Sequence, residues 1–385
     1  MSEGLVRTLT GHAGSVVACA ISPDTRFIVS GSADFTARIW EVESGNEVAT
    51  LAGHGGTVSK CSFSRDGSFL VTASADRTLK IWETATWSER KTLVGHEDAV
   101  MSCAVSPDGS FIASAGLDGA VGVWDVAAGT ARTILRGHTD QVFDCAISPD
   151  GRTIASASPD ATLRLWDAAT GAEKQVLKGS LGVAKFYGCA FSHNGSAVAG
   201  VGDAVYVWDL RDATDRFKMT ANGAPLRCAF SPDDSLIVTA GALYNTLAIW
   251  DLSTRKMKSR LLGTGGTVRD CCFSPDGRLI VSADGDLKTL RVWDVERGLQ
   301  LGTGGCFIAT AAYGSEDHAE VARLRAFRDD TLRRTRSGRA AIRIYERLSP
   351  PIARVVAGSP SCRAFVRLLI LRPMRSIVTA RKEQS

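Results

Sequence analysis

The sequence contains no long hydrophobic run. No segment approaches the ~18 apolar residues that a membrane-spanning helix needs, and residues 1–7 contain no apolar signal segment. No Ser-His-Asp set or glycosidase-like carboxylate pair stands out. Residues 302–305 are rich in glycine, but they lack the lysine and the strand-loop-helix setting of a phosphate loop. We therefore expect a cytoplasmic protein that is not an enzyme and has no cofactor.

Tryptophan, in contrast, recurs with a fixed period. Successive residues of the set are 42 positions apart, with 43 before the last: Trp40, Trp82, Trp124, Trp166, Trp208, Trp250 and Trp293. Around each tryptophan, short segments alternate in the two-residue period of strands, as in residues 36–40. Similar units of this length build a ring of blades. The predicted fold class is therefore all-β, a seven-bladed β-propeller over residues 1–300.

The cysteines also recur once per unit, and they do not form a disulfide set. Seven of the ten recur once per unit in the same strand: Cys19, Cys61, Cys103, Cys145, Cys189, Cys228 and Cys271. Different blades would separate them by more than the ~7 Å between Cα atoms that a disulfide tolerates. We interpret them as small buried hydrophobic residues in a reducing compartment.

Each early unit also contains Gly-His before its first strand, and most units end a strand with Trp-Asp. Gly-His stands at 11–12, 53–54, 95–96 and 137–138, and Trp-Asp at 124–125, 166–167, 208–209, 250–251 and 293–294. The first two units have Trp-Glu instead. Over about residues 4–300 the chain thus resembles the WD-repeat family. The resemblance implies a β-propeller that binds proteins.

In that family a His, a hydroxyl residue, an Asp and the Trp of one blade form a buried hydrogen-bond chain. Complete sets occur in four units: His12, Ser30, Asp34, Trp40; His54, Thr72, Asp76, Trp82; His96, Ser114, Asp118, Trp124; and His138, Ser156, Asp160, Trp166. The histidines belong to different blades, so they cannot share a zinc ion, whose ligands lie within about 2.0–2.3 Å. No metal site is predicted.

The last three units depart from this pattern. Ser180, Asn222 and Thr264 stand near the histidine position, and Tyr244 replaces the Asp of the sixth unit. The seventh keeps Ser282, Asp286 and Trp293 with one residue inserted before the Trp. We expect blades five and six to open more easily than the others.

The first strand of the chain has no unit of its own. Residues 5–9 precede Gly-His, as the outer strand of a blade does elsewhere, so we expect them to complete blade seven and remove its open edge. Residues 299–303 are an alternative segment for the same edge.

The composition changes after a linker at residues 301–305. Residues 306–385 carry 16 Lys and Arg against 7 Asp and Glu, a net charge of +9, whereas residues 1–305 have 29 against 34, a net charge of −5. Residues 306–315, which begin Cys306-Phe307-Ile308, and residues 344–351 resemble a bacterial C-terminal module known for its Cys-Phe-Ile box. Ser315 is suited to cap a helix over 316–336, with further helices over 339–348 and about 361–379. A small α-helical module is predicted over 306–385.

Three interpretations of this module stay open. It is a helical cap that packs on itself or on the propeller, a basic amphipathic surface that contacts anionic membranes, or a surface that binds another partner. Nucleic acid is disfavoured, because the arginines lack interleaved aromatic residues. Cys306 is either a packing residue or a thiol that is modified or reactive.

The function predicted from these features is that of a non-catalytic protein-protein interaction scaffold whose propeller face or channel binds a protein or peptide. Rigid loops on a ring suit recognition. The expected contact residues surround the strand that enters the centre of each blade: Lys60, Phe143, Asp144, Phe186, Tyr187, Arg227 and Asp270. The alternative is a sensing or regulatory protein whose tail contacts a membrane or acts through Cys306.

Overall fold

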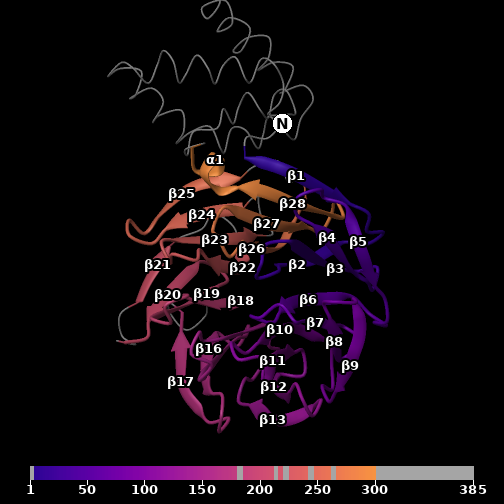
Figure 1. The fold of residues 1–385 in the computed structure, drawn as a ribbon. Coiled ribbons are helices and arrows are strands. Elements are labelled where there is room, and N and C mark those ends of the chain that lie inside the picture. Colours follow the sequence, from indigo (N-terminus) through magenta and orange to yellow (C-terminus); the bar gives the residue numbers. More distant parts are fainter. Residues whose placement is uncertain are drawn as a thin grey trace, which may run out of the picture. The chain divides into compact units, whose positions relative to one another are not determined.

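Seven four-stranded antiparallel sheets make up nearly all of the secondary structure that is described (Figure 1). The computed structural model describes residues 4–179, 185–211, 216–219, 225–241, 247–261 and 266–300. Gly4–Gly298 form one unit, in which the sheets are the blades of a ring. The prediction of an all-β, seven-bladed propeller is confirmed. The linker and the predicted helical module lie outside the described residues.

The strands follow one another in the same order in the first six blades, from the inner strand at the ring centre to the outer strand. Blade one contains β2 (Val16–Ile21), β3 (Phe27–Ser32), β4 (Ala37–Glu41) and β5 (Glu47–Leu51). Blade two contains β6 (Val58–Phe63), β7 (Phe69–Ser74), β8 (Thr78–Glu83) and β9 (Ser88–Val94). Blade three contains β10 (Val100–Val105), β11 (Phe111–Gly116), β12 (Ala120–Asp125) and β13 (Thr130–Arg136).

The other blades complete the ring. Blade four contains β14 (Asp144–Ile147), β15 (Thr153–Ala157), β16 (Thr162–Asp167) and β17 (Glu173–Lys178). Blade five contains β18 (Gly188–Phe191), β19 (Ala197–Val201), β20 (Val205–Asp209) and β21 (Arg216–Met219). Blade six contains β22 (Pro225–Phe230), β23 (Leu236–Gly241), β24 (Leu247–Asp251) and β25 (Lys256–Leu261). Blade seven contains β26 (Val268–Phe273), β27 (Leu279–Asp284), β28 (Thr289–Asp294) and the N-terminal β1 (Leu5–Thr10), and the helix α1 (Val295–Gln300) follows β28.

A Ser-Pro-Asp-Gly turn explains how an inner strand folds back into the second strand of its blade. In blade three Gly109 has a φ of +70°, a left-handed conformation that glycine adopts without strain. Its amide donates to the Ser106 carbonyl at 2.9 Å. The Ser106 hydroxyl donates to Asp108 at 2.6 Å and accepts from the Phe111 amide at 3.0 Å. All of these bonds lie within residues 106–111, so the turn is specified locally.

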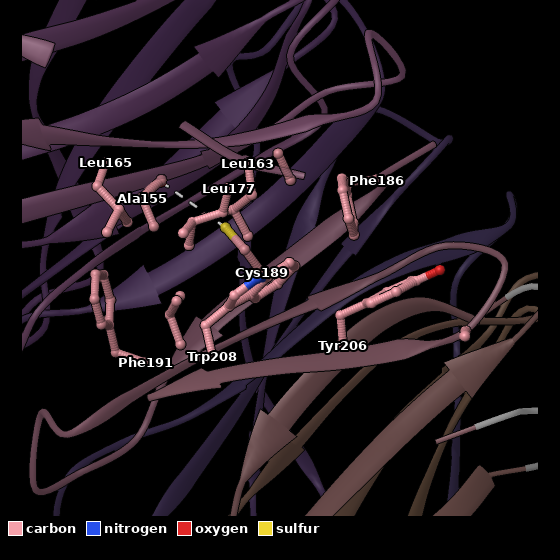
Figure 2. Close-up of a cluster of buried hydrophobic side chains, with 12 residues drawn as sticks. Ala155, Leu163, Leu165, Leu177, Phe186, Cys189, Phe191, Tyr206 and Trp208 are labelled. Carbon is pink, nitrogen blue, oxygen red and sulfur yellow. Dashed lines mark hydrogen bonds between the residues drawn. The ribbon is translucent and has the colours of Figure 1, made fainter. Parts of the chain in front are cut away.

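The apolar core lies between neighbouring blades. Figure 2 shows one such cluster, in which Leu163 and Leu177 of blade four pack against Phe186 and Trp208 of blade five. All four side chains are at most 3% exposed. Trp40 similarly packs on residues of blade seven. Burial of each large apolar side chain contributes about 1.5–3 kcal/mol, so the periodic tryptophans hold successive blades together.

The N-terminal strand closes the ring. β1 lies antiparallel to β28, with Leu5 opposite Trp293 and Thr10 opposite Thr289. In Figure 1 the indigo β1 therefore lies beside the orange β28. The edge of β28 is thus occupied by β1; residues 299–300 belong to α1, and residues 301–303 lie outside the described residues.

Removal of residues 1–10 is expected to leave β28 with an unpaired edge, and such edges promote association. The truncated protein should have a lower Tm and should self-associate, as measured by thermal unfolding and light scattering. Removal of residues 1–3 alone leaves β1 intact and serves as the control. A monomeric protein of unchanged Tm after removal of residues 1–10 would show that β1 is dispensable.

Candidate functional site

A chain of hydrogen bonds crosses each of blades one to four. In blade three the Trp124 indole donates to the Ser114 hydroxyl at 2.8 Å, and Ser114 lies 2.7 Å from His96 Nε2. His96 Nδ1 lies 2.8 Å from the Asp118 carboxylate. The same three contacts span 2.7–2.9 Å in the other three sets: His12, Ser30, Asp34 and Trp40; His54, Thr72, Asp76 and Trp82; His138, Ser156, Asp160 and Trp166.

The direction of the protons follows from the partners. An ionised carboxylate only accepts, so Nδ1 of each histidine carries the hydrogen and Nε2 accepts from the hydroxyl. Burial lowers the pKa of His12 and His54 although Asp34 and Asp76 act in the opposite direction. These two imidazoles are therefore neutral at pH 7, and every donor in their chains has an acceptor.

The aspartates also connect two loops on one side of the ring. Asp118 accepts from the backbone amides of Glu97 at 2.9 Å and Ala120 at 3.0 Å. Glu97 lies in the loop before an inner strand, and Ala120 begins a third strand. We call the side with these loops the top face; it includes residues 12–15 and 33–36 in blade one. Asp34, Asp76 and Asp160 make the equivalent bonds, so the top loops of blades one to four are tied together in pairs.

Blades six and seven retain part of this arrangement. The Trp250 indole donates to Thr239, and that of Trp293 to Ser282, both at 3.0 Å. Asp286 still accepts from the Thr267 amide at 2.8 Å.

Blade five has aromatic packing where the hydroxyl residue is expected. Gly200 occupies that position, and the ring of Phe186 lies edge-on to Tyr206 and Trp208 at 5.5 and 5.7 Å. Ser180, Asn222, Tyr244 and Thr264 lie outside the described residues, and easier opening of blades five and six stays a prediction.

A second polar arrangement surrounds the ring centre. It is formed by the residue before each recurring cysteine, which from blade one to blade seven is Ala18, Lys60, Ser102, Asp144, Gly188, Arg227 and Asp270. Asp270 of blade seven accepts from Lys60 Nζ of blade two at 2.8 and 2.9 Å. It also accepts from the Cys19 amide of blade one at 3.1 Å. One carboxylate therefore joins three blades.

Asp144 has the same role on the other side of the centre. It accepts from the Ser102 hydroxyl of blade three at 2.6 Å and from the Cys189 amide of blade five at 3.0 Å. Arg227 Nε of blade six lies 4.0 Å from the same carboxylate. Asp144 therefore joins its own blade to three others.

Small residues let these charges meet across an intervening blade. Ala18 lies between the blades of Lys60 and Asp270, and Gly188 lies between those of Asp144 and Arg227. A Cβ on Gly188 would lie 2.6 Å from the Leu226 carbonyl oxygen. No larger side chain fits there without displacing β22.

Both cations keep their charge. Burial opposes the charged form of Lys60, but Asp270 and Asp144 outweigh it and raise the pKa of Lys60. The pKa of Arg227 is likewise raised, against the effect of burial, by Asp144 and Asp270. The centre of the ring is a set of compensated charges, not a free acid or base.

The seven expected contact residues have different surroundings. Phe143 and Tyr187 are partly exposed, and their rings meet edge to face at 5.4 Å. Arg227 donates to the Phe143 carbonyl at 3.2 Å and also to the Tyr187 carbonyl. These three residues form what we call the aromatic corner, where β14, β18 and β22 begin.

The expectation for Phe186 is wrong. Its side chain is 0% exposed because it fills the core between blades four and five (Figure 2). Asp144 and Asp270 are also buried, at 4% and 1% exposure, and bind donors of their own chain. Ser102 and Gly188 were missed by the sequence analysis. Aligning the repeats at the recurring cysteine places both in the column that contains the four charges.

The described residues contain no group of three His, Cys, Asp or Glu placed to hold a metal ion. Within the same part of the chain, no helix has the length and apolar character needed to cross a membrane. Cys306 and the basic tail lie outside it.

Replacement Asp118→Ala is expected to loosen blade three, because hydrogen bonds to a charged group contribute ~1.5–3 kcal/mol each. Hydrogen exchange should show the free energy of opening of blade three lowered by about that amount, with blade one unchanged. Asp98→Ala, which removes an exposed carboxylate of the same blade, is the control. Equal effects of the two replacements would contradict the role of Asp118.

The hydrogen bonds of Asp76 predict a loss of stability in acid. Burial would raise the pKa of Asp76, but bonds from Thr78, the Gly55 amide and His54 lower it from 3.8 to about 2. Because its folded pKa is depressed, its stabilisation is complete above about pH 4 and is lost as the pH falls through about 2. Asp76→Asn should weaken this dependence in unfolding measurements, whereas Asp98→Asn should retain it. A wild-type pH profile for Asp76→Asn would exclude this contribution.

Comparison with known proteins agrees with the repeat pattern. The family model described as IFT122 first beta-propeller matches residues 57–305. The model for the WD domain, G-beta repeat, matches residues 3–41. The WD40 repeat-containing protein HOS15 of Arabidopsis thaliana is 51% identical over 41 residues, which are 11% of this chain and 7% of that protein. The match therefore spans only a small part of that relative. With seven blades, four complete His-to-Trp hydrogen-bond chains and a family match over most of the ring, the chain belongs to the WD-repeat β-propellers typified by the first propeller of IFT122.

Proposed function

We propose that this protein is a non-catalytic scaffold that binds a protein or peptide on its top face, at the aromatic corner. WD-repeat propellers commonly act as protein-interaction scaffolds. The observation that carries the proposal is the pairing of Phe143 with Tyr187 beside Arg227. The few residues that contribute most of the binding energy in protein interfaces are enriched in Trp, Tyr and Arg.

The chain's own hydrogen bonds hold the residues of the corner in place before any partner binds. Arg227 is held by backbone carbonyls of blades four and five, and the beginning of β14 is held by the bonds of Asp144. A site that needs little ordering loses less conformational entropy on binding. The exposed parts of the two rings are therefore available for contact at low cost.

A scaffold fits the state of the central charges better than an enzyme does. The carboxylates of Asp144 and Asp270 are bound to donors of the chain itself. To act as a general base, a carboxylate or imidazole must lie within hydrogen-bond reach of the substrate proton that it removes. These buried carboxylates are committed to joining blades.

Two further parts of the proposal concern location and tail. We place the protein in the cytoplasm, which is supported by eight unpaired cysteines in the described residues. A tail that contacts membranes or acts through Cys306 is the competing function. Liposome flotation of the full chain against a chain ending at residue 305 distinguishes the two, because only the competing function predicts tail-dependent flotation.

The test of the scaffold is quantitative affinity purification from the native cell with a Phe143→Ala, Tyr187→Ala double variant. Loss of a site worth about 2 kcal/mol lowers affinity roughly 30-fold, so a direct partner should be strongly depleted. Arg132→Ala is the control, since Arg132 lies near the beginning of the outer strand β13, at the opposite face, and pairs with Asp125 there. Recovery of the same partners with the double variant would rule out the aromatic corner.

A further inference from the structure

The recurring cysteines occupy the same place at successive blade interfaces. Each lies on an inner strand, and the thiols of four of them point toward the preceding blade and donate to a backbone carbonyl oxygen there. These contacts are Cys19 to Val281 at 3.6 Å, Cys103 to Val71 at 3.8 Å, Cys189 to Ala155 at 3.8 Å and Cys271 to Val238 at 3.9 Å. Figure 2 shows the contact of Cys189.

The strand register identifies the residue that faces each of these thiols. Each accepting carbonyl belongs to a residue on the second strand of the preceding blade. That residue pairs with a residue of the blade's inner strand, and this inner-strand residue faces the thiol. That residue is Ser62 opposite Cys103, Ala146 opposite Cys189 and Ala229 opposite Cys271. Opposite Cys19 it is Cys272, which pairs with Val281. Of these four interfaces, the one between blades seven and one therefore contains a second sulfur.

Other contacts place the two thiols together. Asp270 lies two residues before Cys272 on the same side of β26, and its carboxylate accepts from the Cys19 amide at 3.1 Å. Cys272 packs against the buried cluster that contains Cys19. Burial, together with a side-chain hydrogen bond to Cys272, raises the pKa of the Cys19 thiol. Both cysteines are free thiols in this structure.

The two thiols differ in access. Cys19 is 2% exposed, whereas Cys272 is partly exposed. A reagent in solution therefore reaches Cys272 first, and Cys19 is placed to react with the product.

We propose that Cys19 and Cys272 are a redox modification site, which a small disulfide such as oxidised glutathione converts to a disulfide bond between blades seven and one. The Cys272 thiolate attacks one sulfur of the small disulfide, forms a mixed disulfide and releases one thiolate. Cys19 then attacks the Cys272 sulfur, forms the new bond and releases the second thiolate. The two cysteines lose two electrons to the small disulfide, and their two protons end on the released thiols.

This bond joins the inner strands of blades seven and one, which are otherwise in contact only noncovalently; the chain itself links the two blades at the outer strand, from β1 to β2. The disulfide thus connects the inner strands, whereas β1 and β28 close blade seven at its outer edge. A cross-link that closes a long loop restricts the unfolded chain most. The oxidised ring is therefore more resistant to opening than the reduced ring, and the small disulfide controls which form is present.

The test treats the full chain with oxidised glutathione and maps peptides by mass spectrometry without reduction. The expected result is a linked pair of peptides containing Cys19 and Cys272, two hydrogen atoms lighter than the separate peptides, together with a Tm several degrees higher. Dithiothreitol should reverse both. In Cys272→Ala, which has the residue found at the equivalent places in blades four and six, the link and the Tm rise should be absent.

A second variant tests the register itself. Ser62→Cys in the Cys272→Ala background places a thiol opposite Cys103, and oxidation should link these two residues instead. Absence of the Cys19–Cys272 link in the wild-type chain overturns the proposal, whether Cys272 then carries glutathione or remains unmodified. A Tm rise of equal size in wild type and Cys272→Ala overturns the claim that this bond stabilises the ring.

Discussion

Two buried carboxylates hold the inner strands of the seven blades around one centre. Asp270 binds donors from blades one and two, and Asp144 binds donors from blades three and five and lies beside Arg227 of blade six. Loss of one partner of a buried pair costs about 3–5 kcal/mol, because the other charge is left without compensation. Two of these contacts, Lys60 with Asp270 and Arg227 with Asp144, join blades that are not neighbours in the ring.

The ring therefore has two polar systems with different reach. The His-to-Trp chains act within a blade and tie its top loops together, as in the bonds of Asp118. The central charges act between blades and determine how the inner strands are placed relative to one another. Side chains that take part in neither system are available for binding a partner. The rings of Phe143 and Tyr187 are among them.

The repeat period explains which features were predictable from the sequence. Equivalent residues recur every 42 positions, so the tryptophans indicated the blade count and the spacing of His96, Ser114 and Asp118 indicated their contacts. Contacts between blades are not periodic. The partner of Lys60 is Asp270, 210 residues away, and nothing in the spacing of a repeat selects that pair.

The expectation for Phe186 failed for a related physical reason. It adjoins the strand that enters blade five, where a position near the ring centre was expected to be accessible. Gly200 leaves space that only a large ring fills, and Phe186 turns into the core to occupy it. Such an exchange of volume between two residues of one blade is visible only once both are placed in space.

The pairing of β1 with β28 also has a consequence for biosynthesis. β1 is synthesised first, but its partner β28 is translated about 280 residues later. At ~5–20 residues per second, this delay is on the order of 15–60 s. During that time the first six blades can form while β1 has no partner, so closure of the ring comes last.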